Sequence, residues 1–255
     1  IARSIEVEVN QQAEVAEEAV DEHDGLAGLV LGEFRQMKKE QAAENKKLEA
    51  TFAPFADKPI DQLAADPKAV AIGRGIFNNT CATCHGSGGK GAIGYPNLTD
   101  TIWHWGGTAD DVLTSIQQGR QGVMAPWGEV LRGTGGDQAV EYVIAYVRTL
   151  SQKNANLQND FMASQGKKLY DGVCVSCHGA DGKGNPQLGA PDLTDDYWLY
   201  GNSTESLRHT INEGRHGVMP AHEALLGDTR TRLVGAYVWS LSRGQNAAAP
   251  AANAN

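Results

Sequence analysis

The feature that most constrains this chain is an eleven-residue phrase that occurs twice and uses all four cysteines of the sequence. It reads CATCHGSGGKG from Cys81 and CVSCHGADGKG from Cys174. A Cys-x-x-Cys pair followed directly by histidine is the signature for covalent attachment of a c-type haem. Each copy therefore predicts one haem held by two thioether bonds.

The spacing inside each copy has a chemical reason. Two thiols three positions apart on one helical turn lie on the same face, so both can add to the vinyl groups of a single haem. The next residue is a histidine, which then lies under the iron as an axial ligand. The predicted haem-binding residues are Cys81, Cys84 and His85 in the first copy and Cys174, Cys177 and His178 in the second.

A structural zinc site built from the same side chains is the alternative interpretation. Such a site needs two ligand pairs that face each other across one small module. Here the two copies begin at residues 81 and 174, each in its own stretch of sequence. The repetition thus favours two covalently bound haem c groups.

The similarity continues on both sides of the haem motif and sets the expected domain organisation. The aligned segments are 71–86 with 164–179, 96–100 with 191–195, 117–124 with 212–219, and 141–151 with 232–242. We therefore expect two domains of one fold in tandem. The expected division is an acidic and helical N-terminal extension over 1–57, haem domains over 58–152 and 160–243, and a disordered tail over 244–255.

Apolar residues recur at three- and four-residue steps near the end of each copy, which predicts a helix there. Gly73 and Gly166 lie in the first helical segment of each copy and cost about 1 kcal/mol each in helix propensity relative to alanine, so we expect a packing reason. We expect the last helix of each domain to cross its own first helix at close range, with Tyr146 and Tyr237 near the crossings. This crossing resembles that of small class I cytochromes c. The expected fold is all-α, with two tandem class I cytochrome c domains after an N-terminal helical extension.

Each copy offers one methionine between its haem motif and its last helix, and these two residues occupy equivalent places. A thioether is a soft, neutral ligand that raises the reduction potential of a haem relative to a second histidine. Methionine also fills gaps in apolar cores, which is the alternative role. We predict Met124 and Met219 as the second axial ligands, each following the haem-binding histidine of its own copy. His104, His216 and His222 have no histidine counterpart in the other copy, so we expect them at the surface or near a haem propionate.

Further residues are expected around the haems. Arg120 and Arg215 correspond in the two copies and are placed to hydrogen-bond a haem propionate, with solvent exposure as the alternative. By resemblance to class I cytochromes, the carbonyl groups of Pro96 and Pro191 would accept the proton on the other ring nitrogen of each haem-binding histidine. Trp103 belongs to the same expected haem environment.

Charge and composition exclude some classes of function. The net charge is −9, and positions 1–24 contain eight acidic residues and one basic residue. The sequence has no basic patch of the kind that binds nucleic acid. No stretch approaches the roughly 18 apolar residues of a membrane span. The chain begins with Ile1, so we expect a processed or truncated form. Because bacteria attach haem c outside the cytoplasmic membrane, we expect a periplasmic location or the outer face of the inner membrane.

Residues 33–242 resemble the membrane-anchored di-haem subunit of cbb3-type cytochrome c oxidases. The resemblance rests on DPKAVAIGRGIF before the first haem motif, GYPNLTDTIWHWGG after it, and MPAHEALLGDTRTRLVGAYVWSLS near the end. It implies a subunit on the periplasmic side of the bacterial inner membrane, held by an anchor that this chain lacks. It further implies that electrons pass from a soluble periplasmic donor cytochrome to a mono-haem subunit and then to the oxygen-reducing catalytic subunit, with no catalysis by this subunit itself.

Other functions stay open at this point. A free tandem di-haem cytochrome c that shuttles electrons would carry the same motifs. A di-haem enzyme, such as a cytochrome c peroxidase or thiosulfate dehydrogenase, needs an open iron site or a cysteine ligand, and here no spare cysteine exists. A haem-based gas sensor would likewise need a labile sixth ligand.

Overall fold

The computed structural model describes residues 26–151 and 161–246. The acidic segment at residues 1–24, the linker near 152–160 and most of the expected disordered tail lie outside the described residues. The chain divides into two compact units, residues 1–54 and 55–255.

The described chain is mostly helical and contains one two-stranded sheet. In chain order the elements are α2 (Leu26–Phe52), the 3₁₀ helix η1 (Ala53–Phe55), α3 (Ile60–Leu63), α4 (Pro67–Thr80), α5 (Ala82–His85), α6 (Ala109–Gln118), β1 (Arg120–Met124), α7 (Gly128–Gly135), α8 (Ala139–Leu150), α9 (Phe161–Val173), α10 (Val175–His178), α11 (Thr204–Glu213), β2 (Arg215–Met219), α12 (Glu223–Leu226) and α13 (Asp228–Asn246). The all-α expectation is confirmed apart from this short sheet.

The helix of the first unit, α2, leaves large apolar side chains partly exposed to solvent. Phe34 and Met37 on this helix are about half exposed. Local bonds support it, such as the one that Gln36 Nε2 donates to Glu40 Oε1 at 2.6 Å. Among the described residues, α2 included, no helix is both long and apolar enough to cross a membrane.

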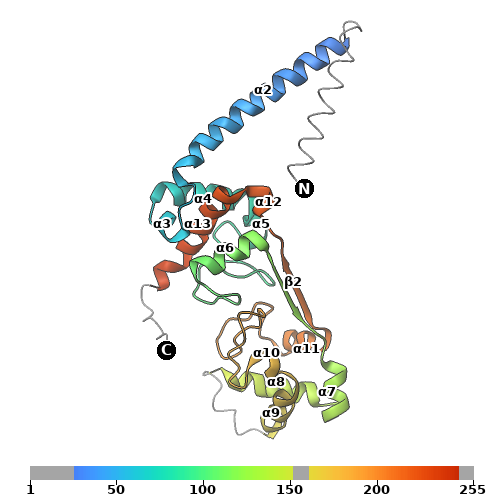
Figure 1. The fold of residues 1–255 in the computed structure, drawn as a ribbon. Helices are drawn as coiled ribbons and strands as arrows, with labels where there is room; N and C mark the ends of the chain where they lie inside the picture. Colours follow the sequence, from blue (N-terminus) through green and yellow to red (C-terminus); the bar gives the residue numbers. More distant parts are fainter. Residues whose placement is uncertain (1–25, 152–160, 247–255) are drawn as a thin grey trace. The chain divides into compact units, whose positions relative to one another are not determined.

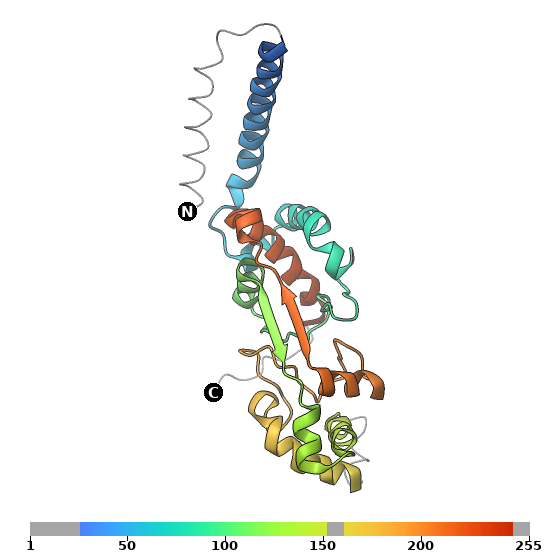
Figure 2. The same cartoon turned by 90° about the vertical axis from the view of Figure 1, so that its right-hand side faces the viewer.

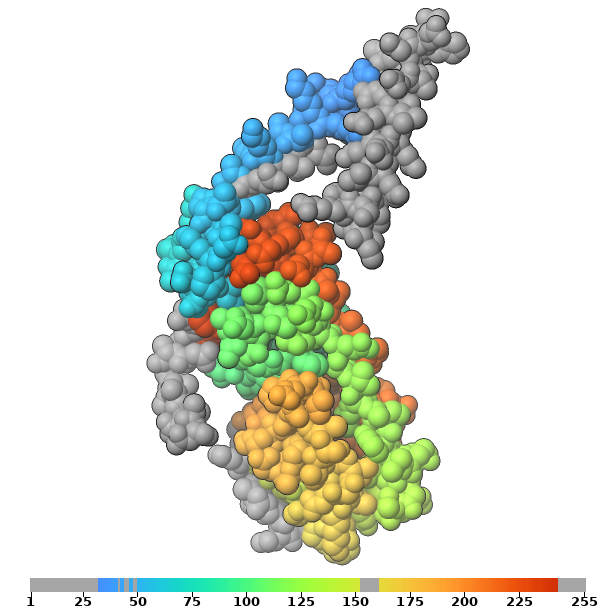
Figure 3. All heavy atoms as spheres, in the orientation of Figure 1, coloured from blue at the N-terminus to red at the C-terminus, as the bar shows by residue number. Residues whose placement is uncertain are grey.

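The helices of the second unit form two modules, and each module contains helices from both repeats. The His85 module consists of α3, α4, α5 and α6 from the first repeat with α12 and α13 from the second. The His178 module consists of α9, α10 and α11 from the second repeat with α7 and α8 from the first. Figures 1 and 2 show α12 and α13, in red, beside α4, and α7 and α8, in green, beside α9 and α11. In the space-filling view, the orange-red residues adjoin the cyan and green ones of the first repeat (Figure 3).

The glycines of the first helices do permit a close crossing, but the crossing partner comes from the other repeat. A Cβ on Gly73 would collide with the carbonyl oxygen of Leu233 in α13 and lie 2.9 Å from Cβ of Tyr237. A Cβ on Gly166 would likewise collide with α8, at the carbonyl oxygen of Tyr142. The expectation that each repeat crosses its own first and last helices is therefore wrong, although the glycine and aromatic contact itself is present. The domain boundaries 58–152 and 160–243 stay a prediction that describes the two sequence repeats. The two modules have other boundaries, because each contains helices from both repeats.

A charge pair explains why the exchanged packing suits this sequence. Arg208 on α11 donates from Nε to Glu141 Oε1 on α8 at 2.6 Å and from Nη2 to Oε2 at 3.2 Å. The repeat alignment places Arg232 of α13 at the position that corresponds to Glu141. If each repeat folded on its own last helix, Arg208 would face Arg232 and two like charges would meet.

The two strands make the connection between the modules. β1 and β2 pair antiparallel, with Gly122 opposite Gly217 at the centre and Arg120 opposite Met219 at one end. Because both strands are extended, each carries its chain from one module to the other (Figure 2). The inward-facing backbone groups of each crossing segment are paired with the other crossing segment.

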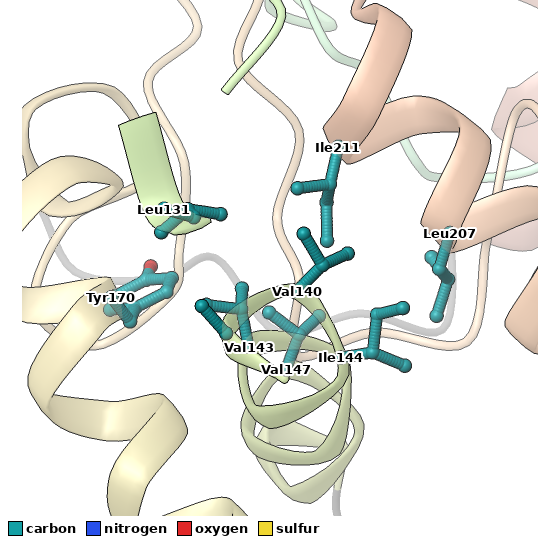
Figure 4. Close-up of a cluster of buried hydrophobic side chains, with 9 residues drawn as sticks. Leu131, Val140, Val143, Ile144, Val147, Tyr170, Leu207 and Ile211 are labelled. Carbon is teal, nitrogen blue, oxygen red and sulfur yellow. The ribbon is translucent and has the colours of Figure 1, made fainter. Parts of the chain in front are cut away.

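The His178 module has a buried core that draws on both repeats. Figure 4 shows Val140, Val143, Ile144 and Val147 of α8 between side chains of neighbouring helices. The neighbours are Leu131 of α7, Tyr170 of α9, and Leu207 and Ile211 of α11. Apolar burial therefore holds the first repeat's α7 and α8 to the second repeat's helices.

We predict that Gly73→Ala destabilises the protein because the added methyl group meets backbone of α13. Overpacking of this kind typically costs about 1–3 kcal/mol, and the midpoint of thermal unfolding of the haem-loaded protein should fall accordingly. Gly75→Ala is the matched control, since a Cβ there has no atom within 4 Å. Equal midpoints for the two variants would contradict the close crossing.

Candidate haem-binding sites

Each haem motif forms one short helical turn with the same hydrogen bonds in both copies. The backbone N–H groups of Cys84 and His85 donate to the carbonyl of Cys81 at 3.2 and 3.0 Å. The second copy repeats both distances at Cys174. This turn brings the two cysteines and the histidine of a motif to one side of the helix.

The thiols of each motif are unpaired and differ in exposure. Cys84 and Cys177 are exposed, whereas Cys81 and Cys174 are half-buried. Burial, with a smaller contribution from the neighbouring cysteine, raises the pKa of Cys81 and of Cys174 to about 11. In the described ranges no group of three or more His, Cys, Asp or Glu residues could hold a metal ion. The zinc alternative gains no support.

The histidine of each motif is oriented by a proline carbonyl. Nδ1 of His85 lies 3.1 Å from the carbonyl oxygen of Pro96, and Nδ1 of His178 lies 3.2 Å from that of Pro191. A carbonyl oxygen only accepts, so Nδ1 carries the proton and Nε2 keeps a lone pair for iron. The hydrogen bonds expected from the class I resemblance are present in both copies.

The electrostatics of the two histidines favour the neutral imidazole that a metal requires. Burial lowers the pKa of His85, the hydrogen bond to Pro96 opposes this, and the charge of nearby His222 lowers it further. Burial also lowers the pKa of His178, opposed by the bond to Pro191. Both rings are thus neutral at neutral pH and suited to bind iron.

A buried donor indicates that the first site fits a haem. Nε1 of Trp103 and Nδ1 of His222 are buried and have no hydrogen-bond partner among the described atoms. An indole N–H can only donate, and a buried donor without an acceptor costs free energy. A haem carries two propionate carboxylates that accept such bonds. The residues present therefore fit a haem, and a propionate contact for Trp103 remains a proposal.

The two arginines of the expected haem environment lie on aromatic rings. The Arg120 guanidinium lies 5.1 Å from the ring centroid of Trp105, and that of Arg215 lies 4.4 Å from Tyr200. Nε of Arg120 also donates to Ser115 Oγ at 2.8 Å. Contact of either arginine with a propionate stays a prediction. Sequence reasoning missed the aromatic partners, although Trp105 and Tyr200 occupy equivalent repeat positions and could have been found from the alignment.

The loops that follow the two haem motifs meet each other. The backbone N–H of Gly94 donates to the carbonyl of Leu199 at 2.8 Å. The N–H of Asn97 donates to the hydroxyl of Tyr197 at 3.0 Å. Trp105 lies against Gly189, where a Cβ would collide with its ring. The two haem-binding regions are therefore in direct contact.

The two methionines lie at opposite ends of the strand pair. Met124 is the last residue of β1 and Met219 is the last residue of β2. Met124 packs on the core of the His178 module, together with Cys174. Met219 lies beside the end of α6 in the His85 module. Gly119 follows that helix, and a Cβ there would collide with the carbonyl oxygen of Met219. The structure thus does not bring either methionine to the module of the histidine that precedes it in sequence.

The sequence of the chain is similar to that of a known protein family. The family model described as cytochrome C oxidase, cbb3-type, subunit III matches residues 68–147 and 161–238. The chain belongs to this family. The match covers both repeats and confirms two tandem cytochrome c sequences of the subunit III type.

Curated relatives carry the same description. A subunit CcoP of Rubrivivax gelatinosus is 40% identical over 214 residues, which are 82% of this chain and 68% of that protein. A subunit FixP of Bradyrhizobium diazoefficiens is 42% identical over 194 residues, 71% of this chain and 65% of the relative. A subunit CcoP of Azospirillum brasilense is 36% identical over 226 residues, which are 82% of this chain and 73% of that protein. These proteins are named as cbb3-type cytochrome c oxidase subunits, so this subunit III chain is a c-type cytochrome of electron transport.

We predict that Gly91→Ala raises the reduction potential of the haem bound by His85. Gly91 has φ +68°, and a Cβ there would lie 2.6 Å from the Pro96 carbonyl oxygen. Displacing that oxygen weakens its bond to Nδ1, which makes His85 a poorer donor to ferric iron. Potentiometric titration would measure the shift. Gly88→Ala is the control because its Cβ would meet no atom within 4 Å, and equal shifts in both variants would contradict the role of the carbonyl.

Proposed function

We propose that this subunit III chain binds two haem c groups covalently and relays electrons through them. Electrons would enter from a soluble periplasmic donor cytochrome and leave to the mono-haem and catalytic subunits of a cbb3-type oxidase. The site would lie on the periplasmic side of the inner membrane. The chain itself would carry out no catalysis.

The contact between the two haem-binding loops is the observation that carries the proposal. Backbone of one loop bonds to backbone and side chain of the other, at Gly94 with Leu199 and Asn97 with Tyr197. The rings of His104 and Tyr197 also approach across this contact, with centroids 5.7 Å apart. Two redox groups held on either side of such a contact are separated by protein atoms and not by bulk water. This arrangement favours transfer from one site to the other.

The residues of each site serve a relay in distinct ways. A bound haem supplies a one-electron couple between ferrous and ferric iron. The cysteines fix it in place, and the neutral histidine held by a proline carbonyl gives it a ligand of constant orientation. In the proposed relay, a partner protein exchanges electrons with the haem that these residues hold.

The number of haems is testable by removing one attachment site at a time. We predict that Cys81→Ala combined with Cys84→Ala lowers the haem content from two to one per chain, and that the same double change at Cys174 and Cys177 does so too. Haem stain on denaturing gels and intact mass would measure this. Ser176→Ala, inside the second motif, should keep both haems. Zinc in the purified protein without covalent haem would contradict the assignment.

The relay itself is testable by kinetics with the haem-loaded chain. We predict that a reduced soluble cytochrome c reduces both haems, and that an oxidase core without this subunit then reoxidises them while oxygen is consumed. A protein with one attachment site removed should lose most of this transfer, because the path is interrupted. Stopped-flow absorbance and oxygen uptake would follow the two steps.

Carbon monoxide distinguishes a relay from an enzyme or a sensor. Two six-coordinate haems should titrate at positive potential and leave carbon monoxide unbound in the reduced protein. Ready binding of carbon monoxide to one haem would reveal an open iron site. That result would replace the relay with a peroxidase-like enzyme or a gas sensor.

A further inference from the structure

The strand pair fixes which module each predicted methionine ligand reaches. Arg120 at the start of β1 lies opposite Met219, and Met124 at the end of β1 lies opposite Arg215. Four residue steps of an extended strand cover roughly 13 Å. The two methionines are therefore at opposite ends of the ribbon, and each has left the module that contains its own repeat's haem motif.

At one end of the ribbon, Met219 enters the His85 module. The chain from Met219 to Ala221 lies against Gly119, where a Cβ would lie 2.8 Å from the backbone nitrogen of Ala221. The N–H of His222 then donates to the carbonyl of Ile116 in α6 at 2.9 Å. The segment that carries Met219 is thus bonded to helix α6 of the first repeat.

At the other end, Met124 enters the His178 module in an equivalent way. The N–H of Trp127 donates to the carbonyl of Ile211 in α11 at 2.8 Å. Met124 and Trp127 pack on the same buried cluster as Cys174 and Val175 of the second haem motif. The two ends therefore show the same local arrangement, related by the symmetry of the repeat.

Contacts specific to one module support this placement. Gly128 lies against Asn212 of α11, where a Cβ would be 3.1 Å from Cα of Asn212. Its repeat counterpart, Glu223, accepts a bond from Gln117 Nε2 at 3.2 Å in the other module. A chain folded within its own repeat would place Glu223 against Asn212, where its Cβ would be crowded by both the side chain and Cα of Asn212. The segment after each methionine is therefore fitted to the other repeat.

We propose that each haem iron takes its methionine from the other repeat, Met219 for the haem held by His85 and Met124 for the haem held by His178. The inference rests on the proposed function in taking two haems as bound. It differs from the expectation drawn from sequence order, in which each repeat completes its own iron site. Each iron then joins the two repeats, in addition to the helices that are exchanged.

The first experiment asks which methionine closes a single haem. In full-length protein carrying Cys174→Ala and Cys177→Ala, only the haem at His85 is bound. Met219→Ala in this background should raise carbon monoxide binding by the reduced protein from none to one per haem, and Met124→Ala should leave it at none. In the background of Cys81→Ala and Cys84→Ala, the effects of the two methionine variants should be reversed.

A second measurement uses the di-haem protein without loss of either haem. With ¹³C-methyl methionine, the two ligand methyl groups should be shifted by the haem ring current in the reduced protein, and Met37 on the exposed face of α2 serves as an unshifted reference. Met124→Leu and Met219→Leu assign the two signals. Nuclear Overhauser contacts should join the Met219 methyl to the haem bonded to Cys81 and Cys84.

The outcomes separate this inference from the proposed function. Opening of the His85 haem by Met124→Ala, or contacts of the Met124 methyl with that haem, would overturn the exchange while leaving a closed di-haem relay intact. Carbon monoxide binding by the parent protein, with no ring-shifted methionine methyl, would overturn methionine ligation and the relay together.

Discussion

The antiparallel pairing of β1 with β2 is the constraint on which the rest of this protein depends. Each strand leaves the module of its own haem motif and pairs with the other strand as it crosses. Once the strands cross, the helices that follow them must complete the opposite module. The core around Val143 and the close approach at Gly73 both result from this crossing.

The exchange also brings the two haem-binding loops together. Trp105 and Tyr200 stand beside the strand glycines, with a Cβ on Gly122 lying 3.6 Å from Trp105 and one on Gly217 lying 3.2 Å from the Tyr200 hydroxyl. Gly217 therefore gives room to the Tyr200 hydroxyl, whereas a side chain at Gly122 would make ordinary contact with Trp105. The arginines at the strand starts, Arg120 and Arg215, cover the same rings. The strand pair, the loops and the cation–π contacts together form one symmetric contact region between the two haem-binding sites.

Local chemistry could be predicted from the sequence, whereas the choice of partner could not. The haem-motif turns followed from the spacing of cysteine and histidine, and the histidine to proline bonds followed from the resemblance to class I cytochromes. The crossing of a glycine with an aromatic residue was expected as well, but the expectation paired helices of the same repeat. In the structure, α4 crosses α13 and α9 crosses α8. Because the repeats are alike, α4 can contact the last helix of either copy through the same groups. Only unlike positions distinguish the two, such as Glu141 against Arg232, and their meaning depends on which helix faces Arg208.

The position of α13 in the His85 module has a consequence for how the chain folds as it is made. The helix that closes the module of the first haem motif is encoded at the end of the second repeat. A chain that emerges from its N-terminus therefore presents both Cys-x-x-Cys-His segments before the first module can close. The His178 module, formed by consecutive helices α7 to α11, can assemble earlier. The chain order therefore allows the module of the second motif to close before that of the first.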